Sequence, residues 1–449
     1  MKSTFIVKDI GMTKSKIIAF FICFFVFGLY LTAQNAWLNT IVWVEKSPQN
    51  VEKLKTMCLD VLMDWEDKIW IVASLEDLDT LKAAGILYSY ADVGNDPNDD
   101  NAADDEGESD RIKENKNENT FDAKSESGNS LHSGQEPASV QTSINGAFHS
   151  YREVETEVYA LEAAHPDLVQ VKIIGRSLEM RNIYALKISD NVQADEGGEA
   201  EVLITGCHHA REWISVEVPL YVAKHLVENY ATDSHIRDLV DRSQVWIIPL
   251  LNPDGLEYTI HFYRYWRKNM RDNGNRTYGV DPNRNYDYKW GIDNEGSSQE
   301  SFSYVYRGPA PFSEPETQAI KDLFAERNFK VAINYHNYSQ VIIYPWGYTN
   351  EPSELDVLLE EMAGEMAARM ERVNGRVYGY GQAGNQLYVT NGGASDWALG
   401  VYGIPAFTIE LPPVDQQYGG FYNPEEDIQS IVRENIPAML YVIEWAIAN

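Results

Sequence analysis

From about Phe148 to the end of the chain, apolar segments of strand length alternate with segments whose apolar residues recur at helical spacing. The helical patterns cover 154–161, 213–230, 354–373 and the last 25 residues. The strand candidates are LVQVKIIG (168–175), IYALKI (183–188), EVLIT (201–205), QVWIIPLL (244–251), KVAINY (330–335), QVIIY (340–344) and FTIEL (407–411). Such alternation is typical of a sheet packed against helices. We therefore expect an α/β fold in which helices cover both faces of a mixed parallel and antiparallel sheet.

The chain has 449 residues, and its composition changes along its length. Residues 34–93 indicate a small α/β domain, with strands near 40–45, 69–72 and 86–93 and helices after Ser74 and through Val51, Leu54, Cys58 and Val61. Residues 94–145 are rich in Asp, Glu, Asn, Ser and Gly, which predicts a disordered acidic linker. An acidic interaction tail is the alternative for this segment. Residues 146–449 form the predicted large domain.

The N-terminus carries four lysines, then an uninterrupted apolar run over 17–31, then Thr32-Ala33-Gln34. This order predicts a secretory signal peptide over 1–33. The run has 15 residues, fewer than the roughly 20 that span a bilayer, although an uncleaved signal anchor is the alternative. We expect a secreted protein, with a vacuole-like compartment as the other destination and no stable membrane partner.

The net charge of −31 comes from 68 acidic and 37 basic side chains. Such an excess of negative charge repels phosphate backbones, so nucleic acid is a poor candidate partner. The three cysteines, Cys23, Cys58 and Cys207, lie in segments of different character and predict no disulfide framework.

The strand candidate EVLIT runs directly into a segment that holds His209 and Glu212 at the spacing His-x-x-Glu. An imidazole and a carboxylate three residues apart can reach one Zn²⁺ from a tight turn. His208 is the alternative to His209, and a helix cap or surface pair is the alternative to a metal site. A catalytic zinc also needs a third protein ligand, for which His336 at the end of KVAINY is the candidate.

Several ordered segments resemble the zinc carboxypeptidase family that includes pancreatic carboxypeptidases A and B. They span about 300 residues and comprise GRSLEMRNIYALKIS, HAREWIS, LNPDGLEYT with RYWRKN, GVDPNRNYD, YHNYSQVIIYPWGY, YVTNGGASDW and FTIEL. Residues 34–93 resemble the inhibitory propeptide of the family in length and in the order of strands and helices. The resemblance implies the zinc carboxypeptidase fold, made as a proenzyme.

This resemblance also implies roles for individual residues. One zinc ion per chain would be held by His209, Glu212 and His336, and Glu410 would be the general base. Arg267 would stabilise the oxyanion of the attacked carbonyl. The substrate-binding residues would be Asn283 and Arg284 for the terminal carboxylate, Tyr388 as a mobile cover, and Arg211 and Tyr338 for the preceding residue. Asp281 would be the partner that orients His209.

The pocket for the terminal side chain departs from both family types. Its base falls on Ser395, where A-type enzymes carry an apolar residue and B-type enzymes an aspartate. The other positions are uncharged: Ile343, Gly347, Ala383, Leu387, Thr390 and Thr408. Because an unpaired buried cation is costly, we expect a preference for apolar or aromatic C-terminal residues.

Activation before residue 146 requires a cut in the linker, whose basic residues are Arg111, Lys113, Lys116 and Lys124. We expect an activating protease, a monomeric enzyme and glycosylation at Asn275. Two further hypotheses remain open. One is a non-catalytic binding protein on the same fold, and the other is a cell-surface component whose peptidase activity is secondary.

Overall fold

The computed structural model describes residues 40–45, 47–55, 60–65, 68–73, 75–90 and 145–449. The predicted signal peptide and residues 94–144 of the predicted linker lie outside the described residues. None of the helices in the described part is long and apolar enough to cross a bilayer.

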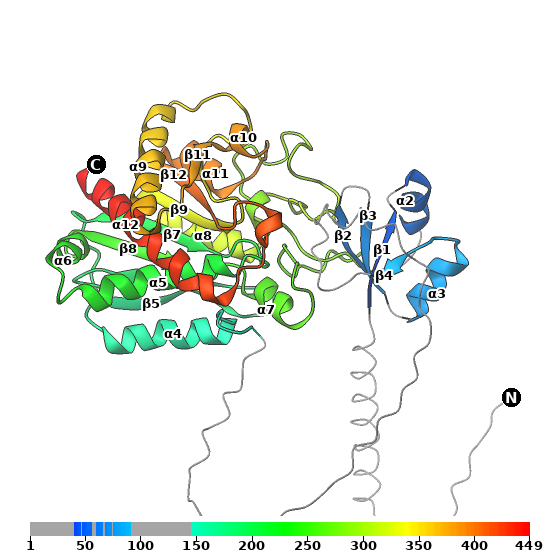
Figure 1. The fold of residues 1–449 in the computed structure, drawn as a ribbon, viewed down its shortest axis with the longest axis horizontal. Helices are drawn as coiled ribbons and strands as arrows, with labels where there is room; N and C mark the ends of the chain where they lie inside the picture. The colour runs from blue at the N-terminus through cyan, green and yellow to red at the C-terminus, as the bar shows by residue number, and fades with distance from the viewer. Residues whose placement is uncertain (1–39, 46, 56–59, 66–67, 74, 91–144) are drawn as a thin grey trace, which may run out of the picture.

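An eight-stranded mixed sheet runs through residues 145–449 in the order β11-β10-β12-β9-β7-β8-β6-β5 (Figure 1). Four neighbouring strands at its centre, β8, β7, β9 and β12, are mutually parallel. The antiparallel strands β6 and β5 extend one edge, and β10 with β11 extends the other. The strands are β5 (Val169–Arg176), β6 (Asn182–Ile188), β7 (Ala200–Gly206), β8 (Ser243–Ile248), β9 (Phe329–Asn337), β10 (Val341–Tyr344), β11 (Gly379–Gln382) and β12 (Ala406–Leu411).

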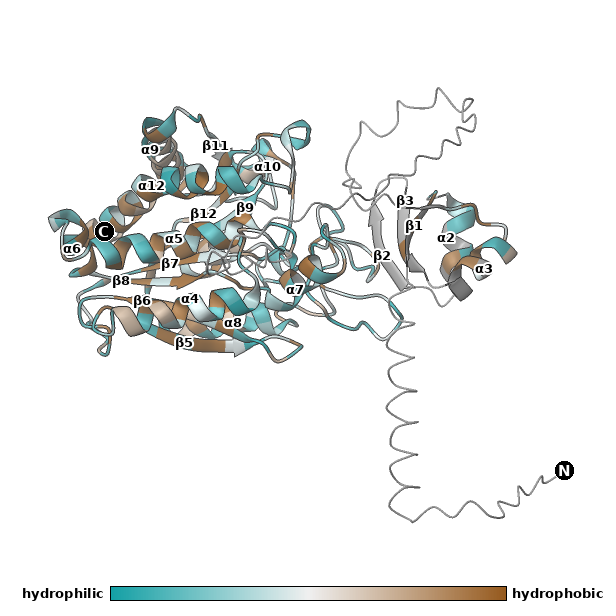
Figure 2. Ribbon diagram, turned by 60° about the horizontal axis from the view of Figure 1, so that its bottom comes forward, coloured by the Kyte–Doolittle hydropathy of each residue, from teal (hydrophilic) through white to brown (hydrophobic). Residues whose placement is uncertain are grey.

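Helices cover both faces of this sheet, as predicted. Successive side chains of a strand point to opposite faces, so Val202 and Ile204 join one hydrophobic cluster and Leu203 joins another. The first cluster packs under α4 (Tyr151–Ala164), α5 (Ile214–Asn229), α6 (Ser234–Val240), α9 (Asp356–Asn374) and α12 (Ile428–Ala448). The second packs under α8 (Pro315–Glu326) and α11 (Ala394–Tyr402). Figure 2 shows the resulting apolar colour along β7 and β8.

The long segment 262–314, between α7 (Pro253–His261) and α8, has almost no regular structure apart from the short helix Pro282–Arg284. Polar side chains hold it in place. Asn269 Nδ2 donates to Glu314 Oε2 at 2.8 Å and to Glu316 Oε2 at 3.0 Å, and Arg271 pairs with Glu314 Oε1 at 3.0 Å. Both carboxylates are fully buried, and burial raises the pKa of Glu316 to about 8. This network fixes the segment to the first turn of α8.

The N-terminal unit is a four-stranded antiparallel sheet in the order β2-β3-β1-β4 with two helices. Its elements are β1 (Thr40–Glu45), α2 (Pro48–Lys55), β2 (Asp60–Trp65), β3 (Lys68–Ala73), α3 (Leu75–Ala83) and β4 (Ser89–Tyr90). The predicted helical pattern from Val51 to Val61 is wrong at Val61, which lies in β2, whereas Cys58 lies outside the described residues. Val61 instead pairs with Ile71, because β2 gains a hydrogen-bonding partner in β3 that the spacing of apolar residues could not show.

Candidate active site

The predicted metal ligands follow two neighbouring parallel strands. Gly206, the last residue of β7, pairs with Tyr335 of β9, and His336 comes next on β9. A Cβ atom on Gly206 would lie 2.2 Å from the carbonyl oxygen of Ser215, so only glycine fits at this position. Cys207 then turns the chain with a φ of 56°. The His-x-x-Glu segment is thereby folded back over the end of β9.

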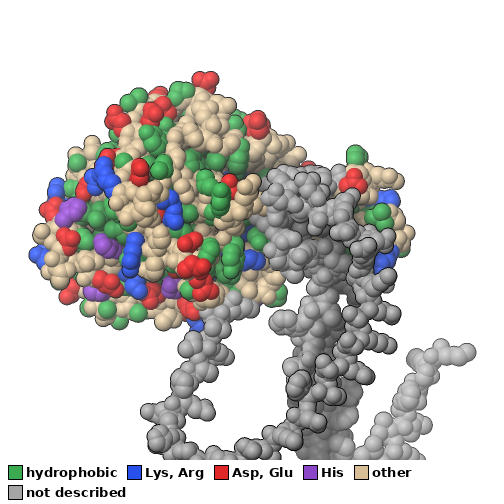
Figure 3. Space-filling view, viewed as in Figure 1, with side chains coloured by type: hydrophobic (Ala, Val, Ile, Leu, Met, Phe, Trp, Pro, Cys, Tyr) green, Lys and Arg blue, Asp and Glu red, His purple; other side chains and the backbone are tan. Residues whose placement is uncertain are grey.

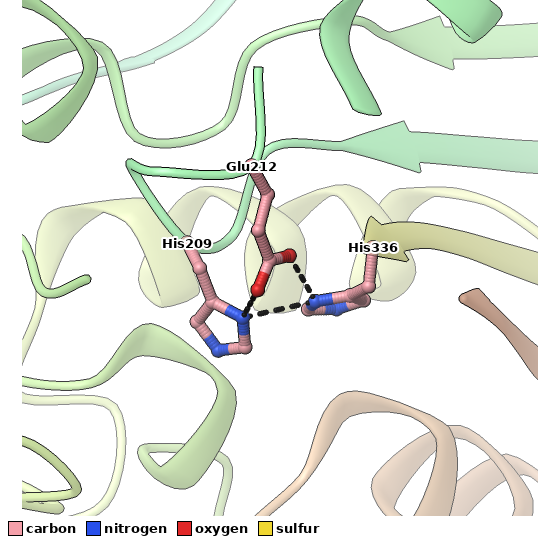
Figure 4. A group of neighbouring side chains, drawn as sticks. All are labelled: His209, Glu212 and His336. Carbon is pink, nitrogen blue, oxygen red and sulfur yellow. Dashed lines mark hydrogen bonds and ion pairs between the residues drawn. The ribbon is translucent and has the colours of Figure 1, made fainter. Parts of the chain in front are cut away.

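His209, Glu212 and His336 point toward one another at this strand end (Figure 4). Glu212 Oε1 lies 2.8 Å from His209 Nδ1, and Glu212 Oε2 lies 2.9 Å from His336 Nδ1. The two Nδ1 atoms are 3.0 Å apart, and all three side chains are buried. His208 is not part of this group: its ring stacks on that of His336 with the centroids 5.3 Å apart, but its Nε2 contacts the hydroxyl of Tyr286 at 2.9 Å. The group offers two imidazole nitrogens and a carboxylate, the donor set of a catalytic zinc site.

The pKa values of His336 and Glu212 are shifted in directions that favour the binding of a cation. Burial lowers the pKa of His336, so its imidazole is neutral and has a lone pair to give. Burial alone would raise the pKa of Glu212, but the two neighbouring histidines hold it well below its ordinary value. The carboxylate of Glu212 therefore stays ionised beside the neutral ring of His336.

Asp281 and Arg267 form a buried pair behind His209. Asp281 Oδ1 lies 3.2 Å from His209 Nε2, and Arg267 Nε donates to Asp281 Oδ2 at 2.9 Å. Against the effect of burial, Arg267 and His209 hold the pKa of Asp281 well below its ordinary value. A carboxylate on the second ring nitrogen fixes the tautomer of a metal-binding histidine, as predicted for this residue.

One cavity of about 340 Å³ brings most of the predicted site residues together. It is lined by His209, Glu212, Arg211, Arg267, Asn283, Arg284, Tyr338, Tyr388, Ser395 and Glu410. Glu410 of β12 is directly opposite His336 of β9 in the register of the parallel pair. Burial and the nearby Glu212 raise the pKa of the half-buried Glu410 well above its ordinary value.

The two residues of the predicted carboxylate clamp, Arg284 and Asn283, are held in place by hydrogen bonds with backbone groups. Arg284 Nε donates to the carbonyl of Gly296 at 2.6 Å, and Arg284 NH1 donates to the carbonyl of Asn283 at 2.8 Å. Asn283 Oδ1 accepts from the backbone N–H of Ala394 at 2.9 Å. Tyr388, by contrast, is 56% exposed, as suits a cover that closes over a bound substrate.

Arg211 and Gln416, which line the cavity, also carry buried donor atoms without an acceptor. The buried Nε and NH1 of Arg211 have no hydrogen-bond partner among the described residues, and its guanidinium stacks 3.7 Å above the ring of Phe421. Gln416 accepts from the hydroxyl of Tyr338 at 3.4 Å, but its buried Nε2 has no acceptor in the described part of the chain.

Sequence reasoning missed Tyr304, Gln416, Phe421 and Asp396, all of which line the cavity. Tyr304 belongs to the irregular segment 262–314, and Gln416 and Phe421 belong to the loop after β12, where no periodicity marks a position. Tyr304 is held next to an anchored stretch, because the buried Lys268 donates through Nζ to the carbonyls of Ser301 and Ser303 at 3.2 and 3.0 Å. Burial lowers the pKa of Lys268 to about 7.

The sequence profile of one protein family, described as zinc carboxypeptidase, matches residues 154–438. The chain belongs to the zinc carboxypeptidase family. It is therefore a metallocarboxypeptidase, a hydrolase of a family that acts on the C-termini of peptides. The buried His–Glu–His group fits the zinc ion after which the family is named.

Individual relatives agree with this assignment. Carboxypeptidase B of Astacus astacus is 35% identical over 289 residues, which cover 63% of this chain and 91% of the crayfish protein. A structure of bovine thrombin-activatable fibrinolysis inhibitor, solved with a tick carboxypeptidase inhibitor, has a TM-score of 0.61 and 30% identity and covers 67% of this chain and 98% of its own. Carboxypeptidase A of Helicoverpa armigera has a TM-score of 0.62 and 25% identity and covers 92% and 98%. The predicted family and fold are both confirmed.

Proposed function

We propose that this chain removes single residues from peptide C-termini with one zinc ion held by His209, Glu212 and His336. The observation that carries the proposal is that His209 and Glu212 line one cavity with the carboxylate of Glu410 and the arginine clamp, and that His336 completes their metal-binding group. Zinc bound there would supply Lewis acidity and lower the pKa of a water molecule toward about 7. The remaining steps belong to the side chains of the chain itself.

Glu410 takes a proton from the attacking water as the water oxygen bonds to the carbonyl carbon of the scissile peptide. Arg267 stabilises the negative charge that develops on the carbonyl oxygen. When the C–N bond breaks, Glu410 passes the same proton to the leaving amine.

Asn283 and Arg284 bind the terminal carboxylate of the substrate, which restricts cleavage to chain ends. A guanidinium held at the cavity wall can give a carboxylate two parallel hydrogen bonds. Arg211 and Tyr338 contact the residue before the scissile bond, and Tyr388 closes over the bound end. Both Arg211 and Tyr338 line the cavity, which supports this role.

The terminal side chain is expected to be apolar or aromatic. The lining residues Ile343, Ala383 and Leu387 are apolar. Asp396 also lines the cavity, but each of its oxygens accepts a backbone N–H, from Gly347 at 2.8 Å and from Tyr348 at 3.0 Å. Burial raises the pKa of Asp396 to about 6. Its charge is thus already compensated, which leaves a C-terminal lysine without a dedicated counter-ion.

We further propose that the enzyme is made as a secreted, monomeric zymogen, with the signal peptide at 1–33, the propeptide at 34–93, the linker at 94–145 and the catalytic domain at 146–449. The Helicoverpa carboxypeptidase A structure supports this division, because its match extends over 92% of this chain. Cleavage by another protease at Arg111, Lys113, Lys116 or Lys124 would release the catalytic domain.

The test compares the full chain before and after limited proteolysis within the linker, with Glu410→Gln and the exposed control Glu361→Gln treated in parallel. Zinc content and hydrolysis of a blocked dipeptide ending in Phe are measured for each protein. We expect one zinc per chain in all of them and activity in the cleaved wild type and Glu361→Gln only. A cleaved wild type that binds zinc but is no faster than Glu410→Gln would support a non-catalytic binding protein.

A further inference from the structure

Three polar side chains from three different elements meet at the base of the terminal side-chain pocket. Thr408 of β12 and Asn334 of β9 are direct partners in the parallel register, so they emerge from the same face of the sheet. Ser395, in the first turn of α11, packs onto that face. Thr408 and Ser395 line the cavity, whereas Asn334 is buried behind them.

These side chains form one hydrogen-bonded series, which we call the polar floor and define as Asn334, Ser395 and Thr408. Asn334 Nδ2 donates to Ser395 Oγ at 3.2 Å, and Ser395 Oγ lies 3.0 Å from Thr408 Oγ1. The two hydroxyls have two protons but share a single hydrogen bond. One O–H of the pair therefore has no protein acceptor among the described residues, and it lies at the cavity surface.

Apolar side chains line the same cavity, among them Ile343, Ala383 and Leu387. Water can satisfy the spare hydroxyl in the empty pocket. An apolar terminal side chain that displaces this water leaves the hydroxyl unpaired, which costs binding energy. A side chain with an apolar body and a hydroxyl at its tip packs against the apolar lining and replaces the water. Tyrosine has this chemistry.

We propose that the polar floor selects a phenolic hydroxyl, so that this enzyme releases C-terminal tyrosine in preference to phenylalanine. The inference rests on the proposed carboxypeptidase function and narrows its aromatic preference to one side chain. Ser395 and Thr408 act here as specificity-determining residues. Neither takes part in the transfer of protons at the scissile bond.

The test measures kcat/KM of the proteolytically cleaved, zinc-loaded enzyme on blocked Gly-X dipeptides in which X is Tyr, Phe, 4-methylphenylalanine or Lys. 4-Methylphenylalanine has nearly the size of tyrosine but no hydroxyl. We expect Tyr to be favoured over Phe by about 3- to 10-fold, the value of one net hydrogen bond, and 4-methylphenylalanine to be no better than Phe. A ratio of Tyr to Phe of one or less in the wild type, or faster release of Lys than of Tyr, would overturn the proposal.

Two substitutions of one residue provide the matched comparison. Thr408→Val removes the hydroxyl and keeps the shape, whereas Thr408→Ser keeps the hydroxyl and removes a methyl group. We expect the ratio of Tyr to Phe to fall toward one in Thr408→Val and in Ser395→Ala, and to survive in Thr408→Ser. A ratio that survives in the Ser395→Ala/Thr408→Val double variant, confirmed as folded by its thermal unfolding, refutes the role of the polar floor.

A binding measurement tests the tyrosine preference independently of the proposed catalytic function. Calorimetric titration of zinc-loaded, linker-cleaved Glu410→Gln with the Tyr and Phe dipeptides reports the pocket without turnover. Tighter binding of the Tyr dipeptide supports the inference even if the wild type hydrolyses nothing, in which case only the proposed function fails. Equal binding of the two dipeptides, with normal hydrolysis by the wild type, would refute the tyrosine preference but not the proposed carboxypeptidase function.

Discussion

Replacement of Glu316 by glutamine should change the pH dependence of stability more than its level. Glu316 is fully buried in the first turn of α8, with one oxygen 3.0 Å from Asn269 Nδ2 and the other without a partner in the described structure. Burial raises its pKa from the ordinary 4.5 to about 8. The folded protein therefore holds a proton on this carboxyl through a pH range in which the unfolded chain has released it.

The sign and size of the effect follow from this proton. Between pH 4.5 and about 8 the folded state binds more protons than the unfolded state, so the free energy of unfolding falls as pH rises. Each pH unit costs about 1.4 kcal/mol, which sums to a loss on the order of 5 kcal/mol at pH 9. Glutamine cannot ionise, so the variant lacks this loss. The side-chain NH₂ group that glutamine introduces would, if unpaired, lower the stability of the variant by about 1–3 kcal/mol at every pH.

The assay is urea unfolding of the metal-free protein at pH 5 and pH 9, followed by tryptophan fluorescence. Glu316→Gln should be equal to or less stable than the wild type at pH 5 and more stable at pH 9. Glu326→Gln, at the exposed end of the same helix, should follow the wild type at both pH values. If the difference between Glu316→Gln and the wild type is the same at pH 5 and pH 9, the argument from burial is wrong.

The remaining predictions concern the metal, the clamp and Lys268. Chelation should abolish the activity of the wild type, and added zinc should restore it. His336→Ala should contain no zinc by elemental analysis, and added zinc should not restore its activity. Arg284→Lys should lower kcat/KM by about 10- to 100-fold, or 1.5–3 kcal/mol, in steady-state kinetics, with zinc content unchanged. The pKa of the buried Lys268 is about 7 in the folded protein and 10.5 in the unfolded chain. The contribution of Lys268 to the free energy of unfolding should therefore rise with pH between about 7 and 10.5. Urea midpoints of Lys268→Met should lack that rise, and parallel midpoints in variant and wild type would contradict it.

The sequence predicted the elements whose side chains repeat with a clear period. All seven strand candidates of the large domain occur in the sheet, and the four central parallel strands are buried and read as nearly continuous apolar runs. The edge strand β11 was missed, since Gly379–Gln382 is short, polar and rich in glycine. The order of the strands depends on contacts between distant residues, such as Gly206 of β7 with Tyr335 of β9, which no local pattern encodes.

The residues of the candidate site also divide into those that local sequence patterns predict and those that depend on distant contacts. The residues that follow strands or belong to dense motifs were predicted, and they line one cavity or the metal-binding group. Tyr304 and Gln416 were missed because they come from irregular segments whose positions are set by distant anchors such as Lys268. The hydrogen bonds of the polar floor also depend on the register of β9 against β12, which composition cannot supply.

The pairing of β7 with β9 has a consequence for the order of folding. His209 and Glu212 are separated from His336 by more than 120 residues, yet their ring and carboxylate atoms lie within 3.0 Å in the finished fold. Closing so long a loop costs chain entropy before any ligand bond repays it. Zinc therefore cannot nucleate this domain as it does a zinc finger, and a nascent chain gains its metal only after the central strands have docked.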